Sequence, residues 1–252
     1  MTLYMIGIGL NDEKDITVKG LEAIKKSDFV YLENYTSRLQ SSVSDLEKFY
    51  GKKIILADRN LVENNADEII DRAKTKDVAF LIIGDVFSAT THADLFLRAK
   101  NKKVKVAVIN NASILNAIGI IGLELYKFGK TTSLPYHEKS FEPETAYDVI
   151  KDNLKQGLHT LVLLDIKADE NRFMTVNEAI ELLLKIETRR KEGIFTRDTK
   201  VIGCARIGGD YKIKYNKAEN LMKENFGKPL HCLVVPGKLH FIEEEFLDLY
   251  KI

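Results

Sequence analysis

The fold is decided by the stretch Val78-Ala-Phe-Leu-Ile-Ile-Gly-Asp-Val-Phe-Ser-Ala-Thr-Thr-His92. Its first six residues are apolar and end at Gly84 and Asp85, which predicts a buried strand followed by a turn. A small polar cluster comes next, and residues 93–100 have the pattern of a helix. In open α/β sheets, ligands bind just beyond the carboxyl ends of the strands. The stretch therefore predicts a strand, a candidate binding loop and a helix, in that order.

Two interpretations of this loop are open. Gly84 lets the backbone approach a ligand closely, and Asp85 can accept hydrogen bonds from an amine or a hydroxyl. In the alternative, the loop is only a turn between strand and helix, and Thr90 or Thr91 caps the helix.

The residues on both sides of this stretch repeat the alternation of strand and helix. We expect strands at 3–8, 29–32, 53–56, 78–83 and 104–109, and helices at 18–26, 42–49, 65–74 and 93–100. Asp15 or Thr17 is the expected cap of the first helix. Such alternation predicts an α/β domain with a doubly wound, mostly parallel sheet and helices on both faces.

The second half has longer separations between its apolar runs. We expect strands at 132–136, 159–165, 200–205 and 231–235, and helices at 114–125, 147–155 and 174–191. This spacing predicts a second α/β domain with a mixed sheet. We place the domains at residues 1–110 and 111–252.

Composition and charge narrow the class of protein. The chain has 252 residues, 45% of them hydrophobic, and a formal net charge of +1, which offers no electrostatic argument for binding nucleic acid or a membrane. Its two cysteines, Cys204 and Cys232, lack metal-ligand spacing and suit a reducing compartment. No apolar run approaches the roughly 20 residues that span a bilayer, and the first residues lack the features of a signal peptide. We therefore expect a cytoplasmic protein.

Two nucleotide-binding motifs are incomplete. Gly7 and Gly9 begin a dinucleotide fingerprint, but its third glycine falls at Asp12, whose charge opposes a pyrophosphate. Gly129-Lys-Thr resembles the end of a phosphate-binding loop, but the required earlier glycine falls at Glu124. The sequence therefore disfavours dinucleotide binding, and the nucleotide triphosphatase interpretation is rejected.

A set of segments resembles the diphthine synthases, the methyltransferases of diphthamide biosynthesis in the tetrapyrrole methylase-like class. The segments are collinear from about residue 3 to residue 245 and include Tyr4-Met-Ile-Gly-Ile-Gly-Leu10, Gly84-Asp-Val-Phe-Ser-Ala-Thr-Thr-His92 and Pro236-Gly-Lys-Leu-His240. The others lie at residues 15–21, 111–114, 125–129, 157–161, 164–167 and 174–178. One departure is Val86, where the family usually has proline.

The resemblance implies a fold and a reaction. It implies two αβα domains with S-adenosyl-L-methionine in the cleft between them, and a homodimer. The implied partner is translation elongation factor 2, whose 3-amino-3-carboxypropyl-histidine is methylated on its amine to diphthine, leaving S-adenosyl-L-homocysteine. Archaeal-type members add three methyl groups and eukaryotic members add a methyl ester. The compact chain favours three.

The resemblance also implies the cofactor contacts. They are Leu10, Asp85, Ser88, Ser113, Ile114, Leu164, Ile207 and His231. All but His231 fall at or just past the ends of predicted strands, where the fold places ligands. Two of them have simpler explanations, because Ser113 can be a helix cap and His231 a histidine at a strand edge.

Methyl transfer from a sulfonium to an amine depends on alignment, because the leaving group departs neutral. We therefore expect no metal, no covalent intermediate and no indispensable catalytic acid. Tyr35, Phe87 or another aromatic residue can stabilise the growing ammonium by a cation–π contact. Two alternatives remain: a tetrapyrrole methylase acting on a macrocycle, and a binding module of the same fold without activity.

Overall fold

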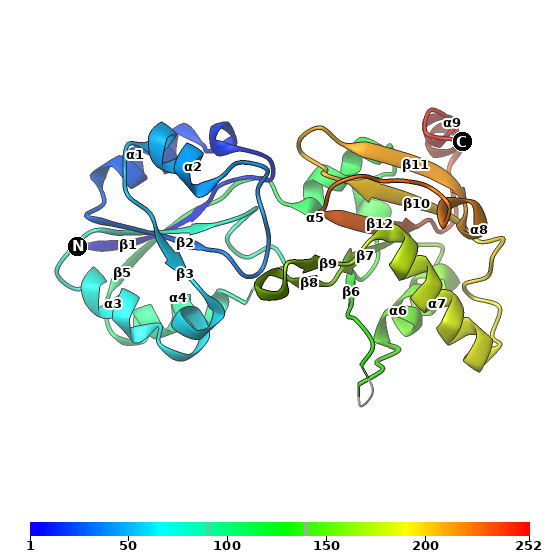
Figure 1. The fold of residues 1–252 in the computed structure, drawn as a ribbon, viewed down its shortest axis with the longest axis horizontal. Helices are drawn as coiled ribbons and strands as arrows, with labels where there is room; N and C mark the ends of the chain where they lie inside the picture. The colour runs from blue at the N-terminus through cyan, green and yellow to red at the C-terminus, as the bar shows by residue number, and fades with distance from the viewer. Residues whose placement is uncertain (90, 139–140) are drawn as a thin grey trace. The chain divides into compact units, whose positions relative to one another are not determined.

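The computed structural model describes residues 1–89, 91–138 and 141–252 (Figure 1). They divide into two compact units, Met1–Ala117 and Ile118–Ile252. The domain boundary that we expect between residues 110 and 111 stays a prediction. Each unit is built on its own sheet.

The first unit contains a five-stranded parallel sheet with the order β3-β2-β4-β1-β5. Its strands are β1 (Thr2–Gly7), β2 (Phe29–Glu33), β3 (Ile55–Ala57), β4 (Val78–Ile82) and β5 (Lys105–Ile109). Every residue of the central β4 is buried, because helices cover both faces of the sheet, and this explains its uninterrupted apolar sequence. The predicted doubly wound parallel sheet is confirmed.

Helices lie on both faces of this sheet. They are α1 (Val18–Lys26), α2 (Val43–Tyr50), α3 (Asp67–Ala73) and α4 (Ala93–Asn101), with short turns η1 (Glu13–Asp15) and η2 (Asn60–Asn64). Val78 and Phe80 of β4 pack on the side of α3 and α4, whereas Ala79 and Leu81 pack on the side of α1 and α2. Figure 1 shows these two pairs of helices on opposite faces of the sheet. The alternation follows from the two-residue period of a strand.

The connections of this sheet create a switch point. From β1 the chain passes through α1 to β2, and from β4 it passes through α4 to β5, so the two neighbouring strands lead in opposite directions. A crevice forms at the carboxyl ends of such strands. The candidate loop after β4 therefore lies where this fold places ligands.

The second unit contains a mixed sheet with the order β11-β10-β12-β7-β6, as predicted. Only β6 and β7 pair in parallel. Its strands are β6 (Thr132–Leu134), β7 (Thr160–Leu164), β10 (Lys200–Ala205), β11 (Lys212–Lys217) and β12 (His231–Val235), beside a small hairpin of β8 (Ile166–Lys167) and β9 (Arg172–Phe173). The helices are α6 (Thr145–Lys155), α7 (Val176–Arg190), α8 (Ala218–Leu221) and α9 (Phe241–Asp248), with η5 at Ala168–Glu170.

Two expectations about helices were wrong. The helix expected at 114–125 is reduced to α5 (Ile114–Ala117) and the 3₁₀ turns η3 (Ile118–Ile121) and η4 (Leu125–Lys127). Gly122, which directly follows η3, adopts a left-handed φ of +84° and packs against the ring of Phe246, so the helical path ends there. Thr91 does not cap α4, since the helix begins after His92, and the alternative cap Thr90 lies outside the described residues.

The strand β11 and the helix α9 were not predicted. In β11 only Ile213 and Tyr215 are buried, and lysines occupy much of the side that faces solvent. Among the described helices, none is long and apolar enough to cross a membrane.

Candidate functional site

Three loops meet at the carboxyl ends of β1, β4 and β5. Gly9 and Gly84 exchange two backbone hydrogen bonds, of 2.7 and 3.3 Å, and both have a φ near +80°, which favours glycine. A Cβ added at Gly84 would have its nearest neighbours, Leu10 Cδ2, the Ala112 carbonyl and Ser113 Cα, at 3.9 Å. An added Cβ would therefore make only ordinary van der Waals contacts with the two neighbouring loops. We call the place where these loops meet, formed by residues 9–11, 84–88 and 110–113, the three-loop cradle.

Asp85 holds two sides of the cradle together. Its Oδ1 accepts hydrogen bonds from Asn110 Nδ2 and the Asn111 N–H, both at 2.9 Å, and its Oδ2 accepts from the Phe87 N–H and the Ser88 hydroxyl, both at 3.2 Å. Burial acts to raise the pKa of Asp85, but these four bonds outweigh it and keep the pKa below its ordinary value. The carboxylate is therefore ionised at neutral pH.

These bonds refine the expected roles of Asp85 and Ser88. A carboxylate offers about four lone-pair sites, and loop groups use all four. In this arrangement Asp85 positions the loops, and Ser88 donates to it. A direct bond from either residue to a ligand stays a prediction. Val86, at the family's usual proline position, is fully buried in the core.

Sequence reasoning missed the role of Asn111. Its Nδ2 donates to the Gly7 carbonyl at 3.0 Å and to the Asp15 carbonyl at 2.9 Å, while its N–H donates to Asp85. One residue thus joins the loops after β1, β4 and β5, through its side-chain amide and its backbone N–H. The polar turn after β5 was visible in the sequence, but its partners lie about a hundred residues earlier.

The loop after β1 confirms that a dinucleotide is disfavoured. The Asp15 Oδ2 accepts hydrogen bonds from the Leu10 and Asn11 N–H groups, at 3.0 and 2.8 Å. These are the groups that would face a pyrophosphate. Asp12 caps η1 instead by accepting from the Lys14 N–H.

Ser113 and Ile114 begin α5. The Ser113 hydroxyl accepts from the Leu115 N–H at 3.2 Å, and the Asn116 side chain accepts from the Ser113 N–H at 2.8 Å. Ser113 is therefore a helix cap, and it also lines the cradle beside Gly84. Contact of either residue with a cofactor stays a prediction.

The predicted cofactor contacts of the second unit also lie together, at one end of the strands of its sheet. Leu164 ends β7, Ile207 follows β10, and His231 begins β12. Because β12 is antiparallel to both neighbours, its first residue lies at the edge where β7 and β10 end. The position of His231 at the start of a strand is thus consistent with the other two.

His231 has structural partners. Its Nδ1 accepts from the Val176 N–H at 3.3 Å, and Nε2 lies 3.1 Å from the Lys228 carbonyl, so Nε2 carries the proton. Burial lowers the pKa of His231, and the ring is neutral at pH 7. It fixes the first turn of α7.

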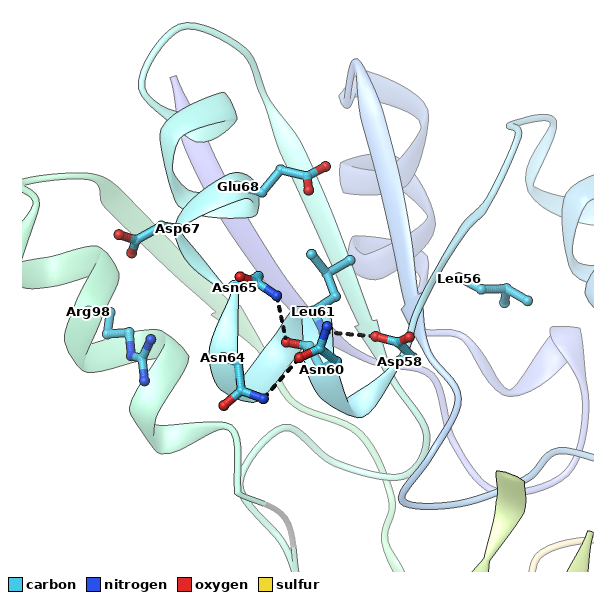
Figure 2. Close-up of a pocket in the computed structure, with 9 residues that line it drawn as sticks. All are labelled: Leu56, Asp58, Asn60, Leu61, Asn64, Asn65, Asp67, Glu68 and Arg98. Carbon is cyan, nitrogen blue, oxygen red and sulfur yellow. Dashed lines mark hydrogen bonds between the residues drawn. The ribbon is translucent and has the colours of Figure 1, made fainter. Parts of the chain in front are cut away.

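A separate hollow of about 630 Å³ lies over β3, η2, α3 and α4 (Figure 2). None of its lining residues belongs to the three-loop cradle. The Asn64 side chain donates to Asn60, and Asp58 accepts from the Leu61 N–H. Arg98 pairs with Asp94. These groups satisfy one another, and the hollow is a solvated surface feature.

Comparison with known proteins identifies the family. The model of the tetrapyrrole (corrin/porphyrin) methylases matches residues 2–214, so the chain belongs to that family. Within it, the diphthine synthase of Methanocaldococcus jannaschii is 50% identical over 249 residues, covering 97% of each chain. The diphthine methyl ester synthase of Dictyostelium discoideum is 47% identical over 270 residues, covering 100% of this chain and 99% of its own. A crystal structure of a diphthine synthase has a TM-score of 0.91 and 40% identity, covering 100% of this chain and 96% of that one.

The predicted class of enzyme is therefore confirmed: the protein is an S-adenosylmethionine-dependent methyltransferase. The cradle suits such a cofactor. A glycine at position 84 keeps the backbone bare where the three loops meet, and the only charge among the predicted contacts there is the carboxylate of Asp85. This negative charge disfavours a phosphate at the cradle and is compatible with a cofactor that carries cationic groups.

His92 gives the first unit a pH dependence. It is 1% exposed, its ring lies 5.5 Å from that of Phe80, and neither ring nitrogen has a hydrogen-bond partner among the described residues. Burial lowers the pKa of His92 from 6.5 to about 4. As the pH falls, His92 in the unfolded chain therefore binds a proton at a higher pH than His92 in the folded protein does. The stability that neutral His92 permits is complete above pH 6.5 and is lost toward pH 4, up to roughly 3 kcal/mol.

We expect His92→Phe to flatten this dependence. Urea unfolding followed by hydrogen exchange of residues 1–117 should show wild type losing more stability than the variant between pH 7 and pH 5. Glu33, whose pKa burial raises, titrates in both proteins, so the difference between them reports His92. Equal losses in the two proteins would contradict the assignment.

Proposed function

We propose that this protein transfers methyl groups from S-adenosyl-L-methionine to the amine of 3-amino-3-carboxypropyl-histidine on elongation factor 2, three times, forming diphthine. The observation that carries the proposal is the three-loop cradle, which gathers Leu10, Asp85 and Ser113 at the switch point of the sheet. The 50% sequence identity to a diphthine synthase, over 97% of this chain, supports the proposed substrate.

The cofactor supplies a methyl group activated on a positively charged sulfur. The chain's own contribution is positioning, which is worth roughly 7–11 kcal/mol when two reactants are held in line. Asp85 and Asn111 fix the loops that would hold one reactant. The acceptor amine must lose its proton before attack, and a water-poor surrounding favours the neutral amine. No step requires a metal or a catalytic acid.

The number of methyl groups is the finer part of the proposal. The relatives include a diphthine synthase and a diphthine methyl ester synthase, at 50% and 47% identity, so identity does not separate the two products. We propose three because the chain is compact. We also propose a cytoplasmic homodimer, supported by the resemblance and by two buried free cysteines that suit a reducing compartment.

Mass spectrometry tests the reaction. Elongation factor 2 bearing the carboxypropyl-histidine is incubated with the protein and S-adenosylmethionine. A gain of three methyl groups on that residue is expected, and a gain of four would assign the methyl ester reaction. No gain with tight cofactor binding would redirect the search to a porphyrinoid acceptor. No gain and no binding would overturn the proposal.

The aromatic residue that could bind the growing ammonium is Phe87. Tyr35 is a poorer candidate, because it is 8% exposed and the guanidinium of Arg59 lies 5.5 Å from its ring centre. Phe87 is 44% exposed. Its ring lies nearly perpendicular to the ring of Phe96, with 5.8 Å between the ring centres, which leaves a face free for a cation.

We expect Phe87→Ala to slow the second and third transfers relative to the first by roughly 2- to 30-fold, from a cation–π contact worth about 0.5–2 kcal/mol. The control Phe87→Leu keeps the apolar bulk but removes the ring, and it should show the same defect. Time-resolved mass spectrometry of mono-, di- and trimethylated product measures it. Normal trimethylation by both variants would exclude Phe87.

A further inference from the structure

The hairpin of β8 and β9 follows β7 directly and is tied to the end of that strand. β7 ends at Leu164, a predicted cofactor contact, and β8 begins two residues later at Ile166. The Met174 N–H, just after β9, donates to the Asp165 carbonyl at 3.0 Å, so the chain returns to the point where the hairpin began. The hairpin is therefore held at the end of the sheet where the predicted cofactor contacts of this unit lie.

Two cationic side chains of the hairpin lie over one aromatic ring. Tyr136 follows β6, which is parallel to β7, and its N–H donates to Asp165 Oδ2 at 2.9 Å. Lys167 and Arg172 are direct partners across the hairpin, so their side chains leave it on the same face. The guanidinium carbon of Arg172 is 3.7 Å from the centre of the Tyr136 ring, and the Lys167 ammonium is 6.0 Å from it.

The two cations differ in their partners. Lys167 forms ion pairs with Glu138, at 2.6 Å, and with Glu170, at 3.7 Å. The carboxylate of Glu178, which also lies near Tyr136, accepts from the N-cap residue of α7. Among the side chains that the structure describes, none forms an ion pair with Arg172. Arg172 is thus a fixed cation without a carboxylate partner.

A stacked and unpaired guanidinium is suited to binding a carboxylate. Stacking on tyrosine uses the flat face of the guanidinium and leaves the N–H donors in its plane open. Those donors match the two oxygens of a carboxylate and can bind both at once. Arg172 is exposed, so a ligand can reach it, while the contact with buried Tyr136 already restricts its motion and lowers the entropy lost on binding.

We propose that Arg172 binds the carboxylate of the 3-amino-3-carboxypropyl group on the acceptor, an inference that rests on the function proposed above. This group carries its carboxylate and the reacting amine on one carbon, so a side chain that holds the carboxylate also orients the amine. The cofactor has an α-amino acid end of the same chemistry. Arg172 is not among the predicted cofactor contacts, however, and Leu164, the contact that precedes the hairpin, is apolar. The acceptor is therefore the expected source of the carboxylate.

The charge of Arg172 also favours the reactive form of the amine. A bare carboxylate beside an amine stabilises the protonated ammonium, whereas a guanidinium that neutralises the carboxylate favours the neutral amine. Methyl transfer requires the neutral amine as its nucleophile. Arg172 thus orients the acceptor and eases the loss of its proton without taking the proton itself.

Steady-state kinetics with elongation factor 2 bearing the carboxypropyl-histidine test the proposal. We expect Arg172→Gln to raise the KM for this acceptor roughly 10- to 100-fold, as for the loss of a hydrogen bond to a charged group. The Kd of S-adenosylmethionine, from calorimetry, should stay unchanged. Arg172→Lys keeps the charge but loses the two-pronged geometry, so it should recover part of the loss. The matched control is Lys167→Gln, which removes the neighbouring, already paired cation and should change the acceptor KM about 2-fold or less.

The pH dependence of kcat at saturating acceptor is a readout that misfolding would not produce. In Arg172→Gln the rise of kcat with pH should move to higher pH, because the amine keeps its proton longer. An unchanged acceptor KM in this variant would overturn the proposal, and so would a loss confined to cofactor binding, which would assign Arg172 to the carboxylate of the cofactor. A wild type that leaves the acceptor unmethylated would overturn the proposed function itself, so the two failures are distinguishable.

Discussion

Replacing Asn111 with aspartate is expected to abolish most methyl transfer, with the loss arising in cofactor binding. In the protein, Asn111 Nδ2 donates to the carbonyl oxygens of Gly7 and Asp15. In Asn111→Asp, a negatively charged oxygen would face these two carbonyl oxygens with no proton between them. Two partly buried acceptors would be left unsatisfied, each at a cost of about 1–3 kcal/mol.

The expected size follows from this cost. About 3 kcal/mol corresponds to an affinity for S-adenosylmethionine lowered on the order of 100-fold or more, because the three loops of the cradle lose their common anchor. Asn111→Ala removes the donors without adding a charge and should lose roughly 10-fold. Isothermal titration of the cofactor measures both. A KM that rises more than kcat falls would assign the loss to binding.

The control is Asn64→Asp, which makes the same chemical change on an exposed side chain of η2. It should leave cofactor binding unchanged. If Asn111→Asp bound the cofactor as tightly as wild type while remaining folded, the cradle would not be the cofactor site.

The strand β4 was predictable because a strand covered on both faces must be apolar throughout. The same local logic located Thr17 as the cap of α1, where its side chain accepts from the Gly20 N–H. Local patterns also placed the polar cluster that follows β4. The parts of the site that depend on near neighbours in sequence were therefore accessible.

The parts that depend on distant contacts were not. Nothing near Asn111 in the sequence indicates that its amide reaches Gly7 and Asp15. Helical periodicity suggested a helix over residues 114–125, whereas α5 ends at Ala117 and the packing of Gly122 against Phe246 stops the helical path after η3. Propensity is a weak indicator where tertiary packing opposes it. The eight contacts taken from the family resemblance fall at one sheet edge in each unit, and their binding role remains to be tested.

Replacing Glu243 is expected to produce the largest loss of stability in the second unit. Burial acts to raise the pKa of Glu243, but its bonds to Lys127, two backbone N–H groups and His159 dominate and lower the pKa to about 2. Glu243→Gln leaves the Lys127 ammonium without its counter-charge in a largely buried position. Breaking a buried ion pair by removing one partner costs about 3–5 kcal/mol.

The chain lacks tryptophan, so hydrogen exchange of residues 118–252 during urea unfolding is the appropriate measurement. Glu244→Gln makes the same change one residue away on the exposed side of α9, and it should cost less than about 0.5 kcal/mol. A loss of similar size in both variants would contradict the role assigned to Glu243.

The pH dependence of the unfolding free energy supplies an independent check on the role of Glu243. Since the folded pKa of Glu243 is about 2 and the ordinary value is 4.5, the unfolded chain binds the proton first as the pH falls. The contribution of Glu243 is therefore complete above pH 4.5 and is lost as the pH falls toward 2. His159, whose pKa burial lowers from 6.5, adds a loss that begins at a higher pH. Glu243→Gln should remove the part between pH 4.5 and 2, because glutamine does not titrate.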